Sequence, residues 1–228
     1  PEICLERARA EMKVFAQYKD EPRVIQRARF LEIYLREKAI FIGDDELIAG
    51  NISSKVRGSI FDGTMSSWLE KELDDPVKDP QFRPFDKHII HPEERKELRE
   101  VLIPFFKGKT LVDYNMATVD AEVKEKAYPG TSSCPHIPDI ADRSMARDAG
   151  HQMANYEKVL HQGLKGIRAE VEYYLAQVAE LYDHYNIQEK KEFYKAVLIS
   201  IDAAIAYAKR YADLAREMAA KETKPKRK

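Results

Sequence analysis

Runs of acidic side chains are the most frequent groups in this sequence that could carry out chemistry. Examples of such runs are Asp44-Asp45-Glu46, Asp74-Asp75 and Glu93-Glu94. General acid–base catalysis needs two carboxyl groups whose surroundings push their pKa values apart. The first run directly follows Gly43, and aspartates in such turns usually accept hydrogen bonds from backbone N–H groups. We therefore expect a turn at this run rather than a catalytic pair.

Histidine is the next candidate, and the six histidines are His88, His91, His136, His151, His161 and His184. The sequence has no HExxH motif and no histidine pair with zinc-ligand spacing and cysteine support, so we expect no metal site. His151 differs from the others because it follows Gly150 at the start of a long helical pattern. Unpaired backbone N–H groups at a helix start often form ligand sites. From the residues alone, capping or packing remains the simpler interpretation of His151.

The two cysteines, Cys4 and Cys134, give no sign of a reactive pair. Neither stands in a CxxC motif, so we expect no disulfide framework and a reducing, cytoplasmic compartment. Pro135 separates Cys134 from His136, which disfavours a thiol activated by that imidazole. Glycine-rich phosphate loops, GxSxG motifs and kinase motifs are also absent from the sequence.

Composition narrows the classes of partner. The 228 residues are 44% hydrophobic and 34% charged, which is typical of a globular chain. Lys and Arg (38) nearly balance Asp and Glu (39), so we expect no nucleic-acid partner. No run approaches the roughly 20 apolar residues that cross a bilayer, and no secretion leader is seen, so we expect no membrane partner. Because the chain starts at Pro1 and ends in a basic run, we expect a processed start or a piece of a longer protein.

The elements that would position these residues differ along the chain. In the first part, Pro22 predicts a helix start, and residues 39–42 and 46–52 predict a strand–turn–strand unit around Gly43. Residues 53–86 are predicted to be mostly irregular, with one short helix around 68–73. A further helix is predicted from Pro92 to Gly108, followed by a loop at 128–138.

The last third predicts two long amphipathic helices. Apolar residues recur every three or four positions from Tyr156 to Leu181 and again from Phe193 to Ala219, with a break at 184–186. Such a pattern indicates an antiparallel helical hairpin. We expect a mainly α chain with a small β element, divided into mixed helices, short strands and loops (1–150), a long hairpin (151–222) and a basic tail (223–228).

The order of the motifs resembles the N-terminal part of a pyruvate formate-lyase-type glycyl radical enzyme. The segments that carry this resemblance are Glu6-Arg7-Ala8, Glu21-Pro22, Gln26-Arg27-Ala28, residues 44–51 (DDELIAGN), residues 68–73 (WLEKEL), residues 105–110 (FFKGKT), Gly150-His151, residues 156–160 (YEKVL), residues 163–167 (GLKGI) and residues 207–215 (YAKRYADLA). The most specific segment is DDELIAGN, which is similar to the family's DDELIVGN. The resemblance extends over essentially the entire chain.

The resemblance implies the N-terminal helical portion of a ten-stranded α/β-barrel enzyme that carries a glycyl radical. The family's RVxGY-like radical motif and its GCxE cysteine motif are both missing here, so neither Cys4 nor Cys134 is assigned that role. The missing C-terminal barrel is therefore an expected partner, as is an AdoMet radical activating enzyme that installs the radical in the parent protein. The resemblance also implies a homo-oligomer.

The resemblance further implies a lyase, dehydratase or decarboxylase that abstracts hydrogen from a small polar substrate with a thiyl radical. A bond from carbon to carbon, oxygen or nitrogen is then cleaved. In dehydratase-like members the histidine of the GH motif contacts the substrate hydroxyl, so His151 becomes the substrate-binding candidate. The chain alone is expected to be inactive. A non-catalytic helical interaction module and a regulatory helical protein unrelated to radicals remain alternatives.

Overall fold

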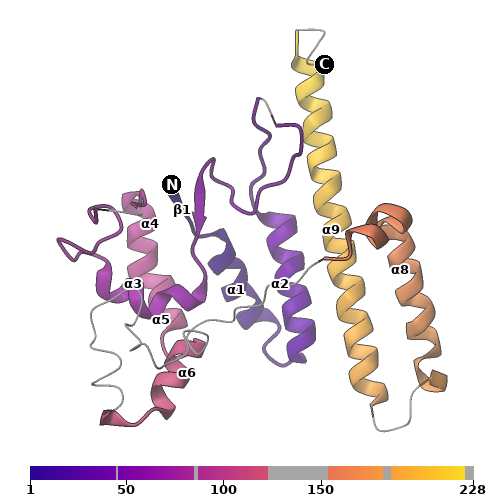
Figure 1. Cartoon of the computed structure of the whole chain (residues 1–228), viewed down its shortest axis with the longest axis horizontal. Helices are drawn as coiled ribbons and strands as arrows, with labels where there is room; N and C mark the ends of the chain where they lie inside the picture. Colours follow the sequence, from indigo (N-terminus) through magenta and orange to yellow (C-terminus); the bar gives the residue numbers. More distant parts are fainter. Residues whose placement is uncertain (45, 85–86, 123–153, 182–185, 224–228) are drawn as a thin grey trace. The chain divides into compact units, whose positions relative to one another are not determined.

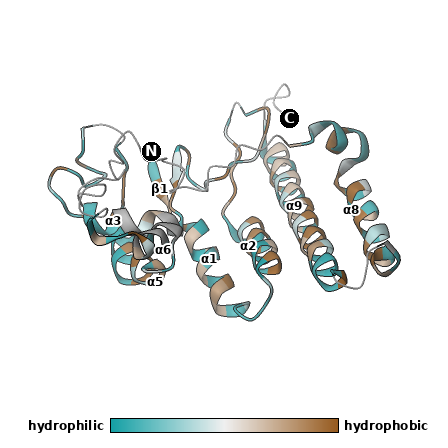
Figure 2. Ribbon diagram, turned by 60° about the horizontal axis from the view of Figure 1, so that its bottom comes forward, coloured by the Kyte–Doolittle hydropathy of each residue, from teal (hydrophilic) through white to brown (hydrophobic). Residues whose placement is uncertain are grey.

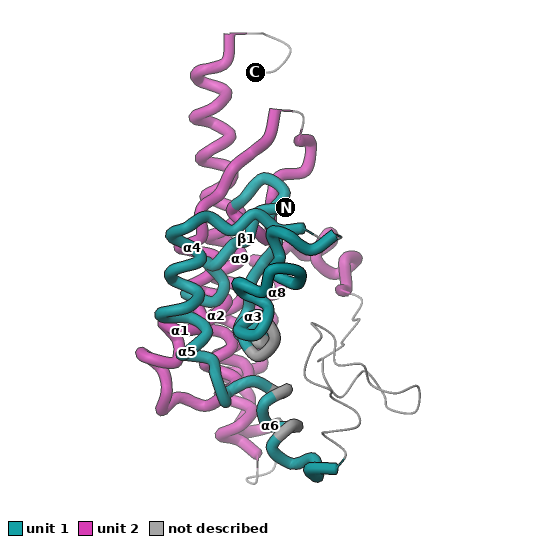
Figure 3. Tube along the Cα trace, turned by 90° about the vertical axis from the view of Figure 1, so that its left-hand side faces the viewer, with its two compact units in different colours: residues 1–9, 55–152 teal, residues 10–54, 153–228 magenta. Residues whose placement is uncertain are grey.

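The computed structural model of the chain describes residues 1–44, 46–84, 87–122, 154–181 and 186–223 (Figure 1). The chain forms two compact units, and each is built from separate stretches of sequence (Figure 3). Unit 1 consists of Pro1–Arg9 and Lys55–Gln152, and unit 2 of Ala10–Ser54 and Met153–Lys228. Helix α1 (Glu6–Gln17) continues from the first stretch of unit 1 into unit 2.

Unit 2 contains three helices that lie side by side. They are α2 (Arg23–Glu37), α8 (Tyr156–Leu181) and α9 (Ile187–Lys221), and α9 lies between the other two (Figures 1 and 2). Each of the three carries apolar and polar residues along its length, as expected for amphipathic helices (Figure 2). Ile25 and Ala28 of α2 pack against Ala196 of α9 in a buried cluster. The small side chains of alanine allow the two helix backbones to approach closely at this contact.

Helices α8 and α9 form the predicted antiparallel hairpin. Arg168 hydrogen-bonds to Asp202, whereas Tyr174, further along α8, stacks on Tyr194, which lies earlier in α9. Contacts in which a later residue of one helix meets an earlier residue of the other show that the two helices are antiparallel. Helix α8 has an irregularity that the apolar spacing does not indicate. Gly163 has φ +67 and ψ 167, so the helix is kinked there in a conformation that side chains with a Cβ rarely adopt.

Unit 1 combines a small parallel sheet with short helices. Strand β1 (Glu2–Cys4) pairs in parallel with β2 (Gly58–Ile60), with Ile3 opposite Ser59. The helical elements that follow are η1 (Gly63–Met65), α3 (Ser66–Glu72), α4 (Pro92–Glu97), η2 (Leu98–Leu102), α5 (Ile103–Phe106) and α6 (Leu111–Thr118). Cys4, Phe61, Leu98 and Leu102 are among the buried side chains of this unit.

The helix predicted from Pro92 is confirmed, with a local change of winding. Residues 92–106 are helical throughout, but η2 is a π-helical turn between the α-helical segments. Pro104 follows this turn and has no backbone N–H to donate to the preceding helical turn. A wider turn at this point is the expected response to the missing hydrogen bond. The short helix predicted near 68–73 is also confirmed, as α3.

The strand–turn–strand prediction for residues 39–52 is wrong. The described residues of this segment form a loop without a strand, and the observed strands are β1 and β2. The physical reason is that side chains of helices bind the backbone of Asn51 and Ile52 in place of a neighbouring strand. The predicted loop at 128–138 lies outside the described residues.

The predicted fold class is confirmed in the part of the chain that the structure describes. It is mainly helical with one two-stranded sheet. None of the described helices combines the length and the apolar character needed to cross a membrane.

Candidate functional site

The substrate-binding candidate, His151, lies outside the described residues, as do Cys134, His136 and His184. The remaining chemistry-bearing residues can be located in the structure. The structure has two polar clusters, one in each unit, and each cluster is described by itself.

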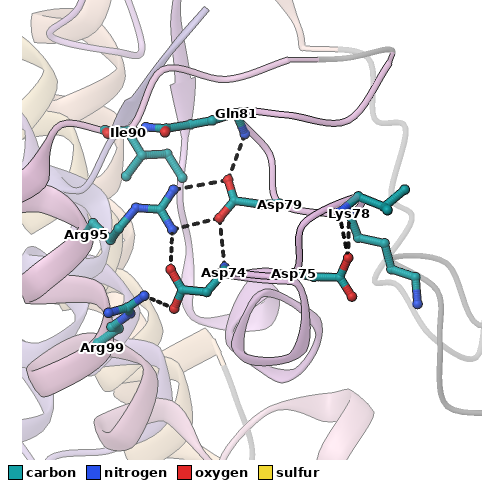
Figure 4. A network of polar contacts seen from close by, with 9 residues as sticks. Asp74, Asp75, Lys78, Asp79, Gln81, Ile90, Arg95 and Arg99 are labelled. Atoms are coloured by element: carbon teal, nitrogen blue, oxygen red, sulfur yellow. Dashed lines mark hydrogen bonds and ion pairs between the residues drawn. The ribbon is translucent and has the colours of Figure 1, made fainter.

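The first cluster lies in unit 1, and we call it the Asp79 network. Its members are Asp74, Asp75, Asp79, Arg95 and Arg99 (Figure 4). Asp79 is fully buried, and both of its carboxylate oxygens accept hydrogen bonds from the Arg95 guanidinium, at 2.7 and 3.0 Å. The same oxygens accept bonds from the backbone N–H groups of Asp74 (2.7 Å) and Gln81 (2.9 Å). Four donors therefore meet one buried carboxylate.

The carboxylate of Asp79 is held in its ionised form. Burial by itself would raise the pKa of Asp79, but the hydrogen bonds from Arg95 and from the Gln81 N–H outweigh burial, and the net pKa is lowered. Asp74 also pairs with Arg95, at 2.9 Å, and with Arg99. Figure 4 shows the Arg95 side chain directed at both aspartates. The arrangement ties α4 and η2 to the loop that follows α3.

The acidic pair Asp74-Asp75 does not act as one unit. Asp75 points away from Arg95 and accepts hydrogen bonds from the backbone N–H groups of Val77 (2.8 Å) and Lys78 (2.9 Å) (Figure 4). These bonds, with that from Lys78 the stronger, lower the pKa of Asp75. Asp74 and Asp75 therefore have separate donors, arginines for Asp74 and backbone N–H groups for Asp75, and do not form the coupled pair that acid–base catalysis needs.

The second cluster lies in unit 2, and we call it the Lys38 cluster. Its members are Tyr34 and Lys38 from the C-terminal end of α2, Asn51 from the loop, and Tyr207 and Tyr211 from α9. The backbone oxygen of Asn51 accepts hydrogen bonds from the Lys38 ammonium and from the Tyr207 hydroxyl, the latter at 2.8 Å. The Asn51 N–H donates to the Tyr211 hydroxyl at 3.3 Å. The cluster thus fixes the loop to the helices at one residue.

Lys38 is only 2% exposed, and aromatic rings surround its charge. Its ammonium nitrogen lies 5.3 Å from the ring centre of Tyr207 and 5.7 Å from that of Tyr34, within the range of cation–π attraction. Burial, followed by the hydrogen bond with Tyr211, raises the pKa of Tyr207, so its hydroxyl stays protonated and able to donate.

An arginine completes the attachment of α9 to α2. The Arg210 guanidinium donates to the backbone oxygens of Leu35 (2.7 Å) and Lys38 (2.8 Å) at the C-terminal end of α2. Helix ends leave carbonyl groups without partners inside the helix, and a cation there also complements the helix dipole. Arg210 therefore stabilises the end of α2 from a neighbouring helix.

The carboxylate of Glu46 joins the two sides of the loop that contains it. It accepts hydrogen bonds from the Gly43 N–H (2.8 Å) and from the Asn51 side-chain amide (3.1 Å). These two bonds, that from Gly43 first, lower the pKa of Glu46. The predicted turn is confirmed by the hydrogen bond from the Glu46 N–H to the Gly43 carbonyl, and the side chain that accepts a backbone N–H is that of Glu46. Asp45 lies outside the described residues.

The other sequence candidates have structural roles. Glu94 accepts a hydrogen bond from the His91 N–H at 3.0 Å and forms a capping box at the start of α4. His88 lies 3.3 Å from the Arg83 guanidinium, and His161 is exposed on α8. Cys4 is buried, and its thiol donates to Glu6 at 3.9 Å.

The polar groups of both clusters bond to backbone groups and to one another, so the structure gives them a role in holding loops and helices together. Among the described residues there is no group of histidine, cysteine and acidic side chains that could hold a metal ion. Sequence reasoning missed Asp79, Lys38 and Tyr207. The only sequence sign for Asp79 is the Asp79-Pro80 dipeptide, which indicates a turn, and a single lysine or tyrosine in a helical pattern carries no sign of its partners.

The similarity of the chain to known proteins extends over its whole length. The family model described as pyruvate formate lyase-like matches residues 1–228. The chain is 33% identical to the Escherichia coli (strain K12) protein named "Probable dehydratase YbiW" and 30% identical to an isethionate sulfite-lyase of Desulfovibrio desulfuricans. Both matches cover 100% of this chain but only 26% and 27% of those proteins. The chain spans about a quarter of the length of these curated relatives.

Two solved structures also align with the whole chain over only about a quarter of their own length. The glycerol-bound B12-independent glycerol dehydratase from Clostridium butyricum aligns with a TM-score of 0.80 at 29% identity, over 100% of this chain and 27% of that chain. A structure on 1,2-propanediol dehydration in Roseburia inulinivorans aligns with a TM-score of 0.81 at 30% identity, over 100% of this chain and 27% of that one.

Proposed function

The chain belongs to the pyruvate formate lyase-like family, and we propose that it is part of a glycyl radical dehydratase or lyase that acts on a small polar substrate. The family predicted from the order of the sequence motifs is thereby confirmed. The activity is our proposal, because the chain spans about a quarter of its relatives.

One observation carries the proposal. The family model matches every residue from 1 to 228, and the relatives at 30% identity or more are named a dehydratase and a sulfite-lyase. Both solved structures named above concern the dehydration of small hydroxylated compounds and superpose on 100% of this chain. Elimination from a small polar molecule is the chemistry that these names have in common.

The radical chemistry is proposed to reside in the rest of the protein. A thiyl radical needs a cysteine that the substrate can reach, but Cys4 is buried and hydrogen-bonded to Glu6, so it does not fit this role. We further propose that the parent protein carries the glycyl radical and that an AdoMet radical activating enzyme installs it. We also propose that the parent protein is a homo-oligomer located in the cytoplasm. In this arrangement His151 would hold the substrate hydroxyl, and the two polar clusters would keep the surrounding backbone in place.

A chimaeric enzyme tests both the class of activity and the role of His151. The matched 27% of the Clostridium butyricum glycerol dehydratase is replaced by this chain, the enzyme is activated without oxygen, and glycerol consumption is measured. We expect turnover, and we expect His151→Gln to raise KM by about tenfold, the effect of losing one hydrogen bond to the substrate. His161→Gln is the matched control, because His161 is exposed on α8.

The outcomes separate the two parts of the proposal. A folded chimaera that consumes no glycerol would contradict the activity for that substrate class. Turnover with the same KM in the His151→Gln variant and in the control would remove His151 from the substrate site while leaving the activity in place. The rise in melting temperature on adding glycerol gives a second readout of binding that does not depend on the radical.

A further inference from the structure

Two large aliphatic side chains stand at the tip of the loop between α2 and the rest of unit 2. Leu47 is 99% exposed and Ile48 is 91% exposed. We call this pair the Leu47–Ile48 knob. Ala49 and Gly50 follow it and are also exposed, so the tip offers apolar surface without a charged side chain between Leu47 and Gly50.

The base of the loop is held firmly although its tip is bare. Glu46 bonds to Gly43 and Asn51 on either side of the tip, as described above. Asn51 is in turn held by the Lys38 cluster, and the backbone oxygen of Ile52 accepts a hydrogen bond from the Tyr34 hydroxyl. Gly50 has φ +129, a conformation that favours glycine and turns the chain back towards Asn51.

A firm base and a bare apolar tip together indicate a contact surface. Leaving a leucine and an isoleucine fully in water forgoes the favourable transfer that burial of either side chain would give. A turn that only reverses the chain has no need of two large aliphatic residues at its tip. Holding a loop in its bound shape before binding also lowers the entropy lost on association. The loop has the properties of a preorganised binding element.

We propose that the Leu47–Ile48 knob inserts into an apolar socket on the remainder of the same pyruvate formate lyase-like domain. This inference rests on the proposed function, since it takes the chain to be one part of such an enzyme. The occupant follows from the comparisons: one family model matches all 228 residues, yet about three quarters of the length of the relatives lies outside the match. That additional sequence is the natural cover for apolar surface on this part.

Binding in trans tests the proposal. The probe is the portion of the Escherichia coli relative that lies outside the match. It is co-expressed with the full 228-residue chain, which carries an affinity tag. The two proteins are then separated, and the dissociation constant is measured by titration. The Leu47→Asp/Ile48→Asp double variant should bind on the order of 100-fold more weakly, because two buried aliphatic contacts are lost. Both side chains are exposed in this chain, so the melting temperature should not change.

A charge-matched control keeps the test specific. Gln162→Asp/Gln188→Asp places the same two negative charges at exposed helix positions and should leave binding within about threefold, as expected for peripheral charges. Leu47→Ala/Ile48→Ala should give an intermediate loss, because it shortens the side chains without adding charge. A graded series of this kind supports insertion into a socket.

Three results would overturn the inference. Equal binding by wild type and the double aspartate variant would show that the knob is not the contact. A change in self-association alone, measured by sedimentation, would make a second copy of the chain the occupant. Failure of the wild type itself to bind the remainder would reject the proposed function together with the inference, whereas the first two results leave the proposed function standing.

Discussion

Replacing Asp79 by Asn should be the most destabilising single-atom change in unit 1. Asp79 is fully buried and accepts four hydrogen bonds, two of them from Arg95. Asn carries an NH₂ group in place of one acceptor oxygen, and this group would face N–H donors that now bond to Asp79. Removing one partner of a buried ion pair costs about 3–5 kcal/mol. Because Arg95 keeps its 2.9 Å contact with Asp74, we expect the lower end, about 3 kcal/mol.

The dependence on pH gives the same prediction a second readout. The pKa of Asp79 is lowered in the folded chain, so the unfolded chain takes up the proton first as the pH falls. The stabilisation by Asp79 is therefore complete above roughly pH 5, and it is lost as the pH falls below the ordinary aspartate value near 3.9 and through the lower folded pKa. The difference between wild type and Asp79→Asn should accordingly shrink in acid.

Urea unfolding at pH 7 and at pH 3.5, followed by tryptophan fluorescence, measures both effects. Trp68 is the single tryptophan of the chain and lies in α3 of the same unit. Asp213→Asn is the control, because Asp213 forms an exposed pair with Arg216 that is worth at most about 0.5 kcal/mol. A loss below about 1 kcal/mol for Asp79→Asn, or a loss that is equal at both pH values, would refute the assigned role.

Three further substitutions test other features, each measured as the free energy of unfolding in urea with circular dichroism. Gly63→Ala should cost about 2 kcal/mol, because a Cβ there would lie 2.5 Å from the Phe106 ring; a neutral result would contradict this packing. Gly163→Ala should cost about 1–2 kcal/mol, because φ is +67 at a site with open space around it, so strain alone is tested. Tyr207→Phe should cost about 1 kcal/mol, because the 2.8 Å hydrogen bond to Asn51 is lost. Tyr114→Phe, at an exposed site, should leave the free energy of unfolding unchanged. Equal effects of the two substitutions would count against the Lys38 cluster.

The helices could be predicted because their signals are local. The apolar spacing from Tyr156 to Leu181 and the Pro92 start with its acidic first turn each depend on neighbouring residues only. The kink at Gly163 was missed because glycine is tolerated inside a helical pattern, and the pattern continues on both sides.

The loop and the polar clusters could not be predicted because their partners are distant in sequence. Residues 46–52 have an apolar, strand-like composition, but Tyr207 and Tyr211 bind their backbone from about 160 positions away. Arg95 reaches Asp79 from 16 positions away. Strands β1 and β2 are three residues each, too short for an alternating pattern to be recognised.

Unit 2 is built from two separate stretches of sequence, and this affects how it can fold during synthesis on the ribosome. Helix α2 is synthesised early, but the Arg210 side chain that binds its last carbonyl groups is 175 residues away from Leu35. At about 5–20 residues per second, translation would take roughly 10–35 s to deliver that side chain. Throughout this interval the nascent α2 lacks its partner helix, so its apolar face stays exposed to water, where a chaperone that recognises short apolar segments could bind it.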